Sequence, residues 1–153
     1  MLPIKSNELR IMAKPKIRVI ALGLIEDNDR ILVSQGYDQE KQITFYRALG
    51  GGVDFGEHSR DALRREFLEE LNAEITDIEY LDCLESIFVY NGSQGHEIIQ
   101  LYRCKFADRQ FYQQEQIPFK EGDRQKLALW VPVERFKSGE AQLVPEGFIK
   151  FLG

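Results

Sequence analysis

The stretch GGVDFGEHSRDALRREFLEELNA, Gly51–Ala73, combines a glycine-rich start with a run of residues that favours a helix. Ser59–Leu71 is predicted to be helical because Ser59 is a good N-cap and Asp61 suits the first turn. Asn72 tolerates the left-handed conformation that commonly ends a helix. The stretch therefore predicts a helix with defined ends, entered from a glycine-rich segment.

Three glutamates share one side of this helix. Glu66, Glu69 and Glu70 are spaced i, i+3 and i+4, which at about 100° per residue places them within roughly a third of the circumference. An apolar stripe lies beside them at i, i+4 and i+8: Leu63, Phe67 and Leu71. Carboxylates at this spacing repel one another, and hard divalent cations such as Mg²⁺ remove that conflict by binding carboxylate oxygens. An acidic run without accompanying features is most often only a solvated helix face.

Further residues of the stretch accompany the acidic face. Glu57 lies at the entry to the helix and can add a fourth carboxylate. Arg65 can hold a glutamate in position through a charge-assisted hydrogen bond. Gly50, Gly51 and Gly52 predict a flexible, tightly turning backbone just before the helix. Together these features favour a metal site over a solvated face.

The whole stretch resembles the Nudix box, G-x5-E-x7-R-E-U-x-E-E-x-G-U, where U is a bulky apolar residue. Phe67 occupies the first U position, and six fixed positions match: Gly51, Glu57, Arg65, Glu66, Glu69 and Glu70. Asn72 replaces the last glycine and Ala73 the final U. These two departures are expected to affect the end of the helix and one packing contact, but not the chemistry of the site.

The resemblance implies an α/β or α+β fold, namely a Nudix-type α/β/α sandwich with a central mixed β-sheet. It also implies hydrolysis of a phosphoanhydride bond in a nucleoside diphosphate linked to another moiety. Mg²⁺, or Mn²⁺ in its place, would be held by Glu66, Glu69 and Glu70, with Glu57 as an additional ligand. The backbone of Gly50–Gly52 would shape the metal site. Metal ions would neutralise the phosphate oxygens, which an acidic site could not otherwise approach.

The expected catalytic residues are Glu70, Glu66 and Arg65 from the box, with a general base that differs among family members. The predicted loop Glu115–Arg124 offers three acidic residues: Glu115, Glu121 and Asp123. Glu121 is preferred because it falls shortly before the predicted strand around Trp130. A solvated loop acid is an equally good interpretation.

The sequence signals for substrate-binding residues are less specific than the Nudix box. Tyr90 falls seventeen residues after the box, at a position that resembles the marker of the family's diadenosine polyphosphate hydrolases. A lone aromatic residue in a strand is more often part of the core. Tyr46 and Arg47 are candidates to stack on a base or contact a phosphate, and either can equally be structural.

The length of 153 residues predicts a single domain, 1–153, without a repeat or linker. A net charge of −5 without a basic patch argues against polymeric nucleic acid or a membrane surface as the partner. The first residues contain no apolar signal-peptide core, so the cytoplasm is the expected location, with Cys83 and Cys104 reduced. The expected partner is a small nucleotide.

The rest of the chain predicts mostly strands. Lys16–Ile25 and Arg30–Gln35 are expected to pair as a hairpin, and Glu85–Tyr90 is expected to pair with Glu97–Phe106. The other predicted elements are two strands and a short terminal helical turn: Thr44–Leu49, Leu127–Val133 and Phe148–Leu152.

Two other function classes fit parts of the sequence. A Nudix-fold module that binds nucleotides or regulates without turnover would be favoured by loss of a box glutamate, and none is lost. A calcium-binding domain is disfavoured because the spacing of the EF-hand loop is absent. Dimers are frequent in the family, so a homodimer is one expectation, although no pattern identifies its interface.

Overall fold

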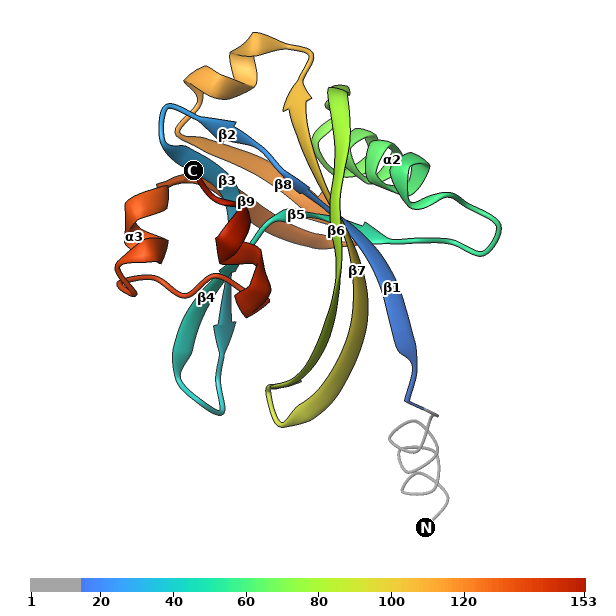
Figure 1. Cartoon of the computed structure of the whole chain (residues 1–153), viewed down its shortest axis with the longest axis vertical. Coiled ribbons are helices and arrows are strands. Elements are labelled where there is room, and N and C mark those ends of the chain that lie inside the picture. The colour runs from blue at the N-terminus through green and yellow to red at the C-terminus, as the bar shows by residue number, and fades with distance from the viewer. Residues whose placement is uncertain (1–14) are drawn as a thin grey trace.

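The computed structural model describes residues 15–153, and its two β-sheets lie between helical segments (Figure 1). The first sheet has four strands in the order β5 (Leu49–Gly52), β1 (Ile17–Leu24), β7 (Ser93–Phe106) and β6 (Ile75–Tyr90). β1 runs parallel to β7 and antiparallel to β5, and β6 pairs antiparallel with β7. This sheet is therefore mixed.

The second sheet is antiparallel. Its strands are β2 (Glu26–Asp27), β3 (Arg30–Asp38), β4 (Ile43–Arg47), β8 (Gln116–Glu121) and β9 (Arg124–Pro132). The order is β2-β3-β9-β8, and β4 pairs with β3. The β3–β4 hairpin and the long β6–β7 hairpin extend in the same direction from the centre of the molecule (Figure 1).

The helical segments lie on two sides of the sheets. α2 (Ser59–Leu71) lies on one side, and α3 (Val133–Lys137) and the 3₁₀ helix η2 (Glu146–Phe151) lie on the other (Figure 1). A further 3₁₀ helix, η1 (Arg109–Gln113), precedes β8. None of the helices in the described part of the chain has the length and hydropathy that crossing a bilayer requires. The layers and the mixed sheet confirm the predicted fold class.

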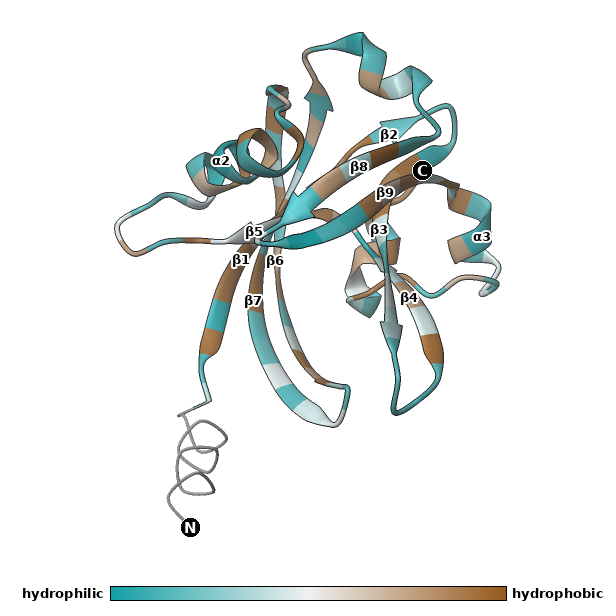
Figure 2. Ribbon diagram, turned by 180° about the vertical axis from the view of Figure 1, so that it is seen from behind, coloured by the Kyte–Doolittle hydropathy of each residue, from teal (hydrophilic) through white to brown (hydrophobic). Residues whose placement is uncertain are grey.

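Two apolar clusters hold the layers together. Figure 2 shows both teal and brown segments around α2. One cluster joins the two sheets to α3 and η2 and includes the fully buried Phe148. The other joins α2 to the sheets through Leu63 and Phe67, which are at most 1% exposed. Leu71 packs partly buried against this cluster. The predicted apolar stripe is therefore the packing face of α2.

The predicted hairpin between Lys16–Ile25 and Arg30–Gln35 is wrong in its strand pairing. β1 pairs with β5 and β7, and only the two residues of β2 pair with the start of β3. The predicted turn does form, and Asn28 and Asp29 have positive φ angles there. β1 is buried over five consecutive residues, as expected of a strand inside a sheet that is covered on both faces.

The β6–β7 pairing is confirmed, with strands longer than predicted and a turn at Asn91-Gly92. The predicted strand Thr44–Leu49 is interrupted at Ala48, which separates β4 from β5. The three glycines do not form the predicted tight turn, since they continue β5 as extended edge strand. The predicted loop Glu115–Arg124 is instead mostly β8 and its turn into β9.

Candidate active site

The α2 helix has the predicted bounds, but its N-terminus differs from the prediction. His58 precedes the first turn and makes no side-chain capping bond. Ser59, predicted as the N-cap, is the first helical residue, and its hydroxyl lies 2.6 Å from that of Tyr102. This bond anchors the start of α2 to β7. Asn72 has the predicted left-handed conformation, with φ 52° and ψ 41°.

Arg65 connects the acidic residues of the box. Its Nε and Nη2 donate to the two carboxylate oxygens of Glu57 at 2.8 and 2.9 Å. Nη1 donates to Glu66 at 2.9 Å and to Glu69 at 3.3 Å, and Nη2 also donates to the Gly52 carbonyl oxygen at 2.9 Å. The planar guanidinium is suited to such forked bonds. Arg65 thereby fixes α2 against the end of β5.

The Glu57 carboxylate is stabilised in its charged form. The side-chain hydrogen bonds from Arg65, followed by a bond from the Asp54 backbone N–H, lower the pKa of Glu57 to about 2. The same pairing raises the already high pKa of Arg65. Both groups therefore stay charged at neutral pH.

Replacing Glu57 by Gln is expected to change how stability depends on pH. Because folding depresses the pKa of Glu57, its contribution is fully present above its ordinary pKa of 4.5. That contribution is lost as the pH falls through about 2. Urea denaturation from pH 7 to pH 2 should show wild type and E57Q converging in this acidic window. A constant difference across it would contradict the pairing.

Glu66 and Glu70 lie together on the face of α2 that approaches β5. Partial burial, followed by a hydrogen bond with the Glu66 carboxyl group and the charges of Glu66 and Glu121, raises the pKa of Glu70 to about 9. A hydrogen bond between two carboxyl groups requires a proton on one of them. A β-carbon at Gly51 would lie 2.6 Å from Glu66 Oε2, so glycine leaves the space that this carboxylate fills.

The donor set fits a hard divalent cation. Two carboxylates that must share a proton at neutral pH present oxygen ligands whose repulsion a cation would relieve. Of the four predicted ligands, the structure brings Glu66 and Glu70 together, and Arg65 bonds to Glu57, Glu66 and Glu69. Within residues 15–153, no three His, Cys, Asp or Glu side chains are grouped as a ready-made metal site. The Glu66–Glu70 pair is therefore the candidate centre.

Glu121 is the last residue of β8, which packs against α2. Its charge is one of the causes that raise the pKa of Glu70, and Lys126 Nζ lies 3.5 Å from its Oε1. The alternative bases lie elsewhere on this hairpin, since Glu115 precedes β8 and Asp123 lies in the turn after it. Of these three acidic residues, Glu121 is the one whose charge raises the pKa of Glu70.

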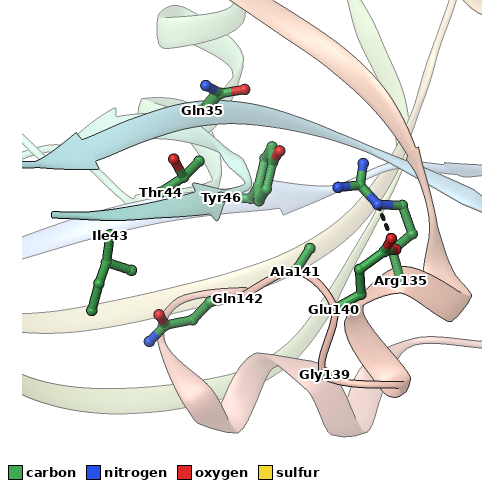
Figure 3. Close-up of a pocket in the computed structure, with 9 residues that line it drawn as sticks. All are labelled: Gln35, Ile43, Thr44, Tyr46, Arg135, Gly139, Glu140, Ala141 and Gln142. Carbon is green, nitrogen blue, oxygen red and sulfur yellow. Dashed lines mark hydrogen bonds and ion pairs between the residues drawn. The ribbon is translucent and has the colours of Figure 1, made fainter.

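The three predicted substrate contacts are dispersed. Tyr46 is 9% exposed and lines an open pocket of about 450 Å³ beside α3, where the Arg135–Glu140 ion pair also lies (Figure 3). No box residue lines this pocket. Tyr90 ends β6 and meets the Phe45 ring edge-on, 5.6 Å between centroids.

Arg47 points away from that pocket, toward the first sheet, and bonds to Glu97. The sequence analysis missed Glu97 and its second partner, Arg18. Arg18 is the only charged residue of β1, and Glu97 is followed in β7 by the apolar pair Ile98-Ile99. That pattern signals a charge which the fold must either pair or use.

Comparison with known proteins agrees with this geometry. The family model described as the NUDIX domain matches residues 14–151. The chain belongs to the Nudix hydrolase family. The Nudix box identified in the sequence, with its helix and glutamates, is therefore the family's defining segment in its expected place.

Individual relatives are more distant. The chain is 31% identical over 70 residues to the human protein "NAD(P)H pyrophosphatase NUDT13, mitochondrial", a match that covers 46% of the chain and 19% of that protein. Two solved structures share the Nudix fold. The MutT Nudix hydrolase of Burkholderia pseudomallei has a TM-score of 0.58 and 24% identity over 78% of this chain and 85% of its own. The Nudix hydrolase of Nitrosomonas europaea has a TM-score of 0.60 and 14% identity, over 88% of this chain and 85% of its own.

Proposed function

We propose that this Nudix chain is a pyrophosphohydrolase that uses Mg²⁺, or Mn²⁺, to hydrolyse a nucleoside diphosphate linked to another moiety. The observation that carries the proposal is the Glu66–Glu70 carboxyl pair, in which Glu66 faces Gly51 and the pKa of Glu70 is raised by burial, by Glu66 and by the charge of Glu121. A site of this charge can approach a phosphoanhydride only when a cation lies between them.

Glu66 and Glu70 would hold the ion, with Glu69 as a further ligand and Glu57 fixing the arrangement. The ion would neutralise phosphate oxygens and acidify a bound water. Arg65 orients Glu57 and Glu66, which keeps the acidic face of α2 in register with β5. Glu69 is 58% exposed, and its bond to Arg65 Nη1 is long, at 3.3 Å. Because such an exposed ion pair contributes little to stability, the Glu69 side chain can turn toward an ion at little cost.

Glu121 would act as the general base that takes a proton from the attacking water. Its replacement by Gln is expected to lower kcat by about 10²-fold with little change in metal affinity. The matched control is Glu115→Gln, which removes an acid from the same hairpin, before β8. Steady-state kinetics should find the control close to wild type. Near-normal kcat in E121Q would remove Glu121 from the reaction.

The overall reaction is tested by a panel of nucleoside diphosphate derivatives and triphosphates, incubated with Mg²⁺ in ¹⁸O-labelled water. The proposal expects ¹⁸O in one phosphate product, and mass spectrometry identifies the phosphorus that is attacked. The panel begins with ADP-containing compounds, because two proteins to which this chain is similar are named an NAD(P)H pyrophosphatase and an "ADP compounds hydrolase". Tight nucleotide binding without turnover of any compound would favour the silent binding module instead.

The cytoplasm remains the proposed location. Both cysteines are free thiols, Cys83 exposed and Cys104 buried, as expected in a reducing compartment. Burial raises the pKa of the Cys104 thiol to about 12, which keeps it protonated and unreactive.

A further inference from the structure

We propose that Arg18 and Arg47, both paired with the buried Glu97, form an anion site for a phosphate group of the substrate. The site would lie across β5 from the α2 glutamates. This inference rests on the proposed function, because it assigns a binding site to a phosphate group of the substrate that is not bound at the metal. It adds Arg18 and Glu97 to Arg47, which the sequence analysis suggested as a phosphate contact, and all three residues lie outside the Nudix box.

Glu97 is an unusual residue in this fold. It is 5% exposed, and Asp38 is the other charged residue buried to this degree in residues 15–153. A buried carboxylate is costly unless it is paired. Here Arg47 Nη2 donates to Glu97 Oε1 at 2.7 Å, and Arg18 Nη1 lies 3.8 Å from Oε2. One negative and two positive charges leave the cluster with a net charge of +1.

The three residues come from three strands of both sheets. Arg18 on β1 is the register partner of Glu97 on β7, and Arg47 reaches them from β4. Among residues 15–153, neither guanidinium makes a hydrogen bond other than the one from Arg47 to Glu97. The Arg18 and Arg47 side chains are 63% and 30% exposed. Glu97 therefore holds the Arg47 guanidinium by a hydrogen bond and attracts that of Arg18, and the remaining N–H donors of both are available to a ligand.

The arginines lie close to the candidate metal site. Successive residues of a strand face opposite sides of the sheet. On β5, a β-carbon at Gly51 would point at the Glu66 carboxyl group, and one at Gly52 would lie 3.5 Å from Arg18 Nη2. The Gly52 carbonyl oxygen also accepts from Arg65 Nη2 at 2.9 Å. Arg18 and Glu66 thus approach the edge strand β5 from opposite faces, and a polyphosphate that passes this edge would place one phosphate at the arginines and another at the Glu66–Glu70 pair.

A purely structural role is the competing explanation, since the Arg47–Glu97 bridge also links the two sheets. Two features favour the anion site. A structural bridge needs one arginine, whereas the second, Arg18, is largely exposed and 3.8 Å from its partner. An exposed ion pair at that distance contributes little to stability. Arginine forks are also well matched to phosphate oxygens.

The test is binding of inorganic pyrophosphate to the full chain in excess EDTA, measured by isothermal titration calorimetry. Arg18→Ala and Arg47→Ala are each expected to raise the Kd about tenfold, as is Glu97→Gln, which would act by releasing both arginines. Arg64→Ala is the matched control, because it removes one positive charge from an exposed position of α2. It should leave the Kd within about twofold of wild type. Arg18→Lys should restore part of the affinity.

Unchanged pyrophosphate binding in Arg18→Ala would overturn the proposal, since this exposed side chain can be removed without disturbing the fold. A Glu97→Gln variant that is less stable but binds pyrophosphate normally would assign the bridge a structural role and overturn it as well. In the hydrolysis assay, the arginine variants should raise KM more than they lower kcat. Because the binding assay needs no turnover, a wild type that binds but does not hydrolyse would contradict the proposed function alone.

Discussion

Glu70→Gln is expected to lower turnover by about 10³-fold while the protein stays folded. Glu70 is partly buried and hydrogen-bonded to the Glu66 carboxyl group, so its replacement removes one half of the candidate metal-binding pair. Gln keeps the size of the side chain but cannot supply a negative oxygen ligand. Steady-state kinetics at saturating Mg²⁺ would measure the loss, and near-normal turnover would rule out the metal assignment.

The same substitution should stabilise the metal-free protein. Folding raises the pKa of Glu70 from 4.5 to about 9, so between these values the folded state holds a proton that the unfolded state releases. Metal-free wild type therefore loses stability as the pH rises through this window. E70Q cannot titrate, and after allowance for solvent screening it should gain about 1 kcal/mol at pH 8.

Urea denaturation in EDTA at pH 5 and pH 8 would measure this gain. Glu69→Gln is the matched control because Glu69 is 58% exposed and bonds only to Arg65, at 3.3 Å. The difference in stability between Glu69→Gln and wild type should be nearly independent of pH in the same range. If E70Q were less stable than wild type at pH 8, the carboxyl pair would not be strained, and the reason for placing a cation there would be lost.

Local sequence patterns predicted the helix of the Nudix box better than they predicted the sheets. The bounds of α2 and the left-handed Asn72 follow from residues within one helix, where neighbours three and four positions apart decide the structure. The partner of β1 does not follow in this way, because an apolar strand can pair with any other. Its place between β5 and β7 depends on the packing of the whole domain.

The Arg18–Glu97–Arg47 cluster was unpredictable for the same reason. Arg18 and Glu97 are nearly eighty residues apart and meet only because β1 runs parallel to β7. Arg47 was singled out as a phosphate contact, but its buried partner depends on how β4 crosses the first sheet. The sequence shows which predicted strands contain charged residues, and the tertiary structure decides which of these residues pair.

The three glycines before the box loop are expected to respond differently to alanine, although the sequence predicts one role for all of them. Gly50 has a φ of +155°, and a β-carbon there would overlap the Ala21 carbonyl oxygen across the β1–β5 ladder. Backbone atoms cannot move aside as a side chain can. Gly50→Ala should therefore destabilise the fold by about 3 kcal/mol or more.

Gly51→Ala should instead preserve the fold and remove activity. Its β-carbon would meet only the end of the Glu66 side chain, which can rotate away, whereas Glu66 must stay in place to share an ion with Glu70. Misplacing one such group is expected to cost about 10²-fold in kcat/KM. Gly52→Ala is the control, since its β-carbon would make only an ordinary contact, 3.5 Å from Arg18 Nη2.

Thermal unfolding and hydrolysis assays on the three variants separate these effects. Gly50→Ala should show a lowered Tm, Gly51→Ala a wild-type Tm with little activity, and Gly52→Ala a wild-type Tm with most of its activity. If Gly51→Ala were as active as Gly52→Ala, the position of Glu66 against β5 would not matter for catalysis. A glycine at position 51 is therefore required by the carboxylate it faces, and the glycine at position 50 by the strand beside it.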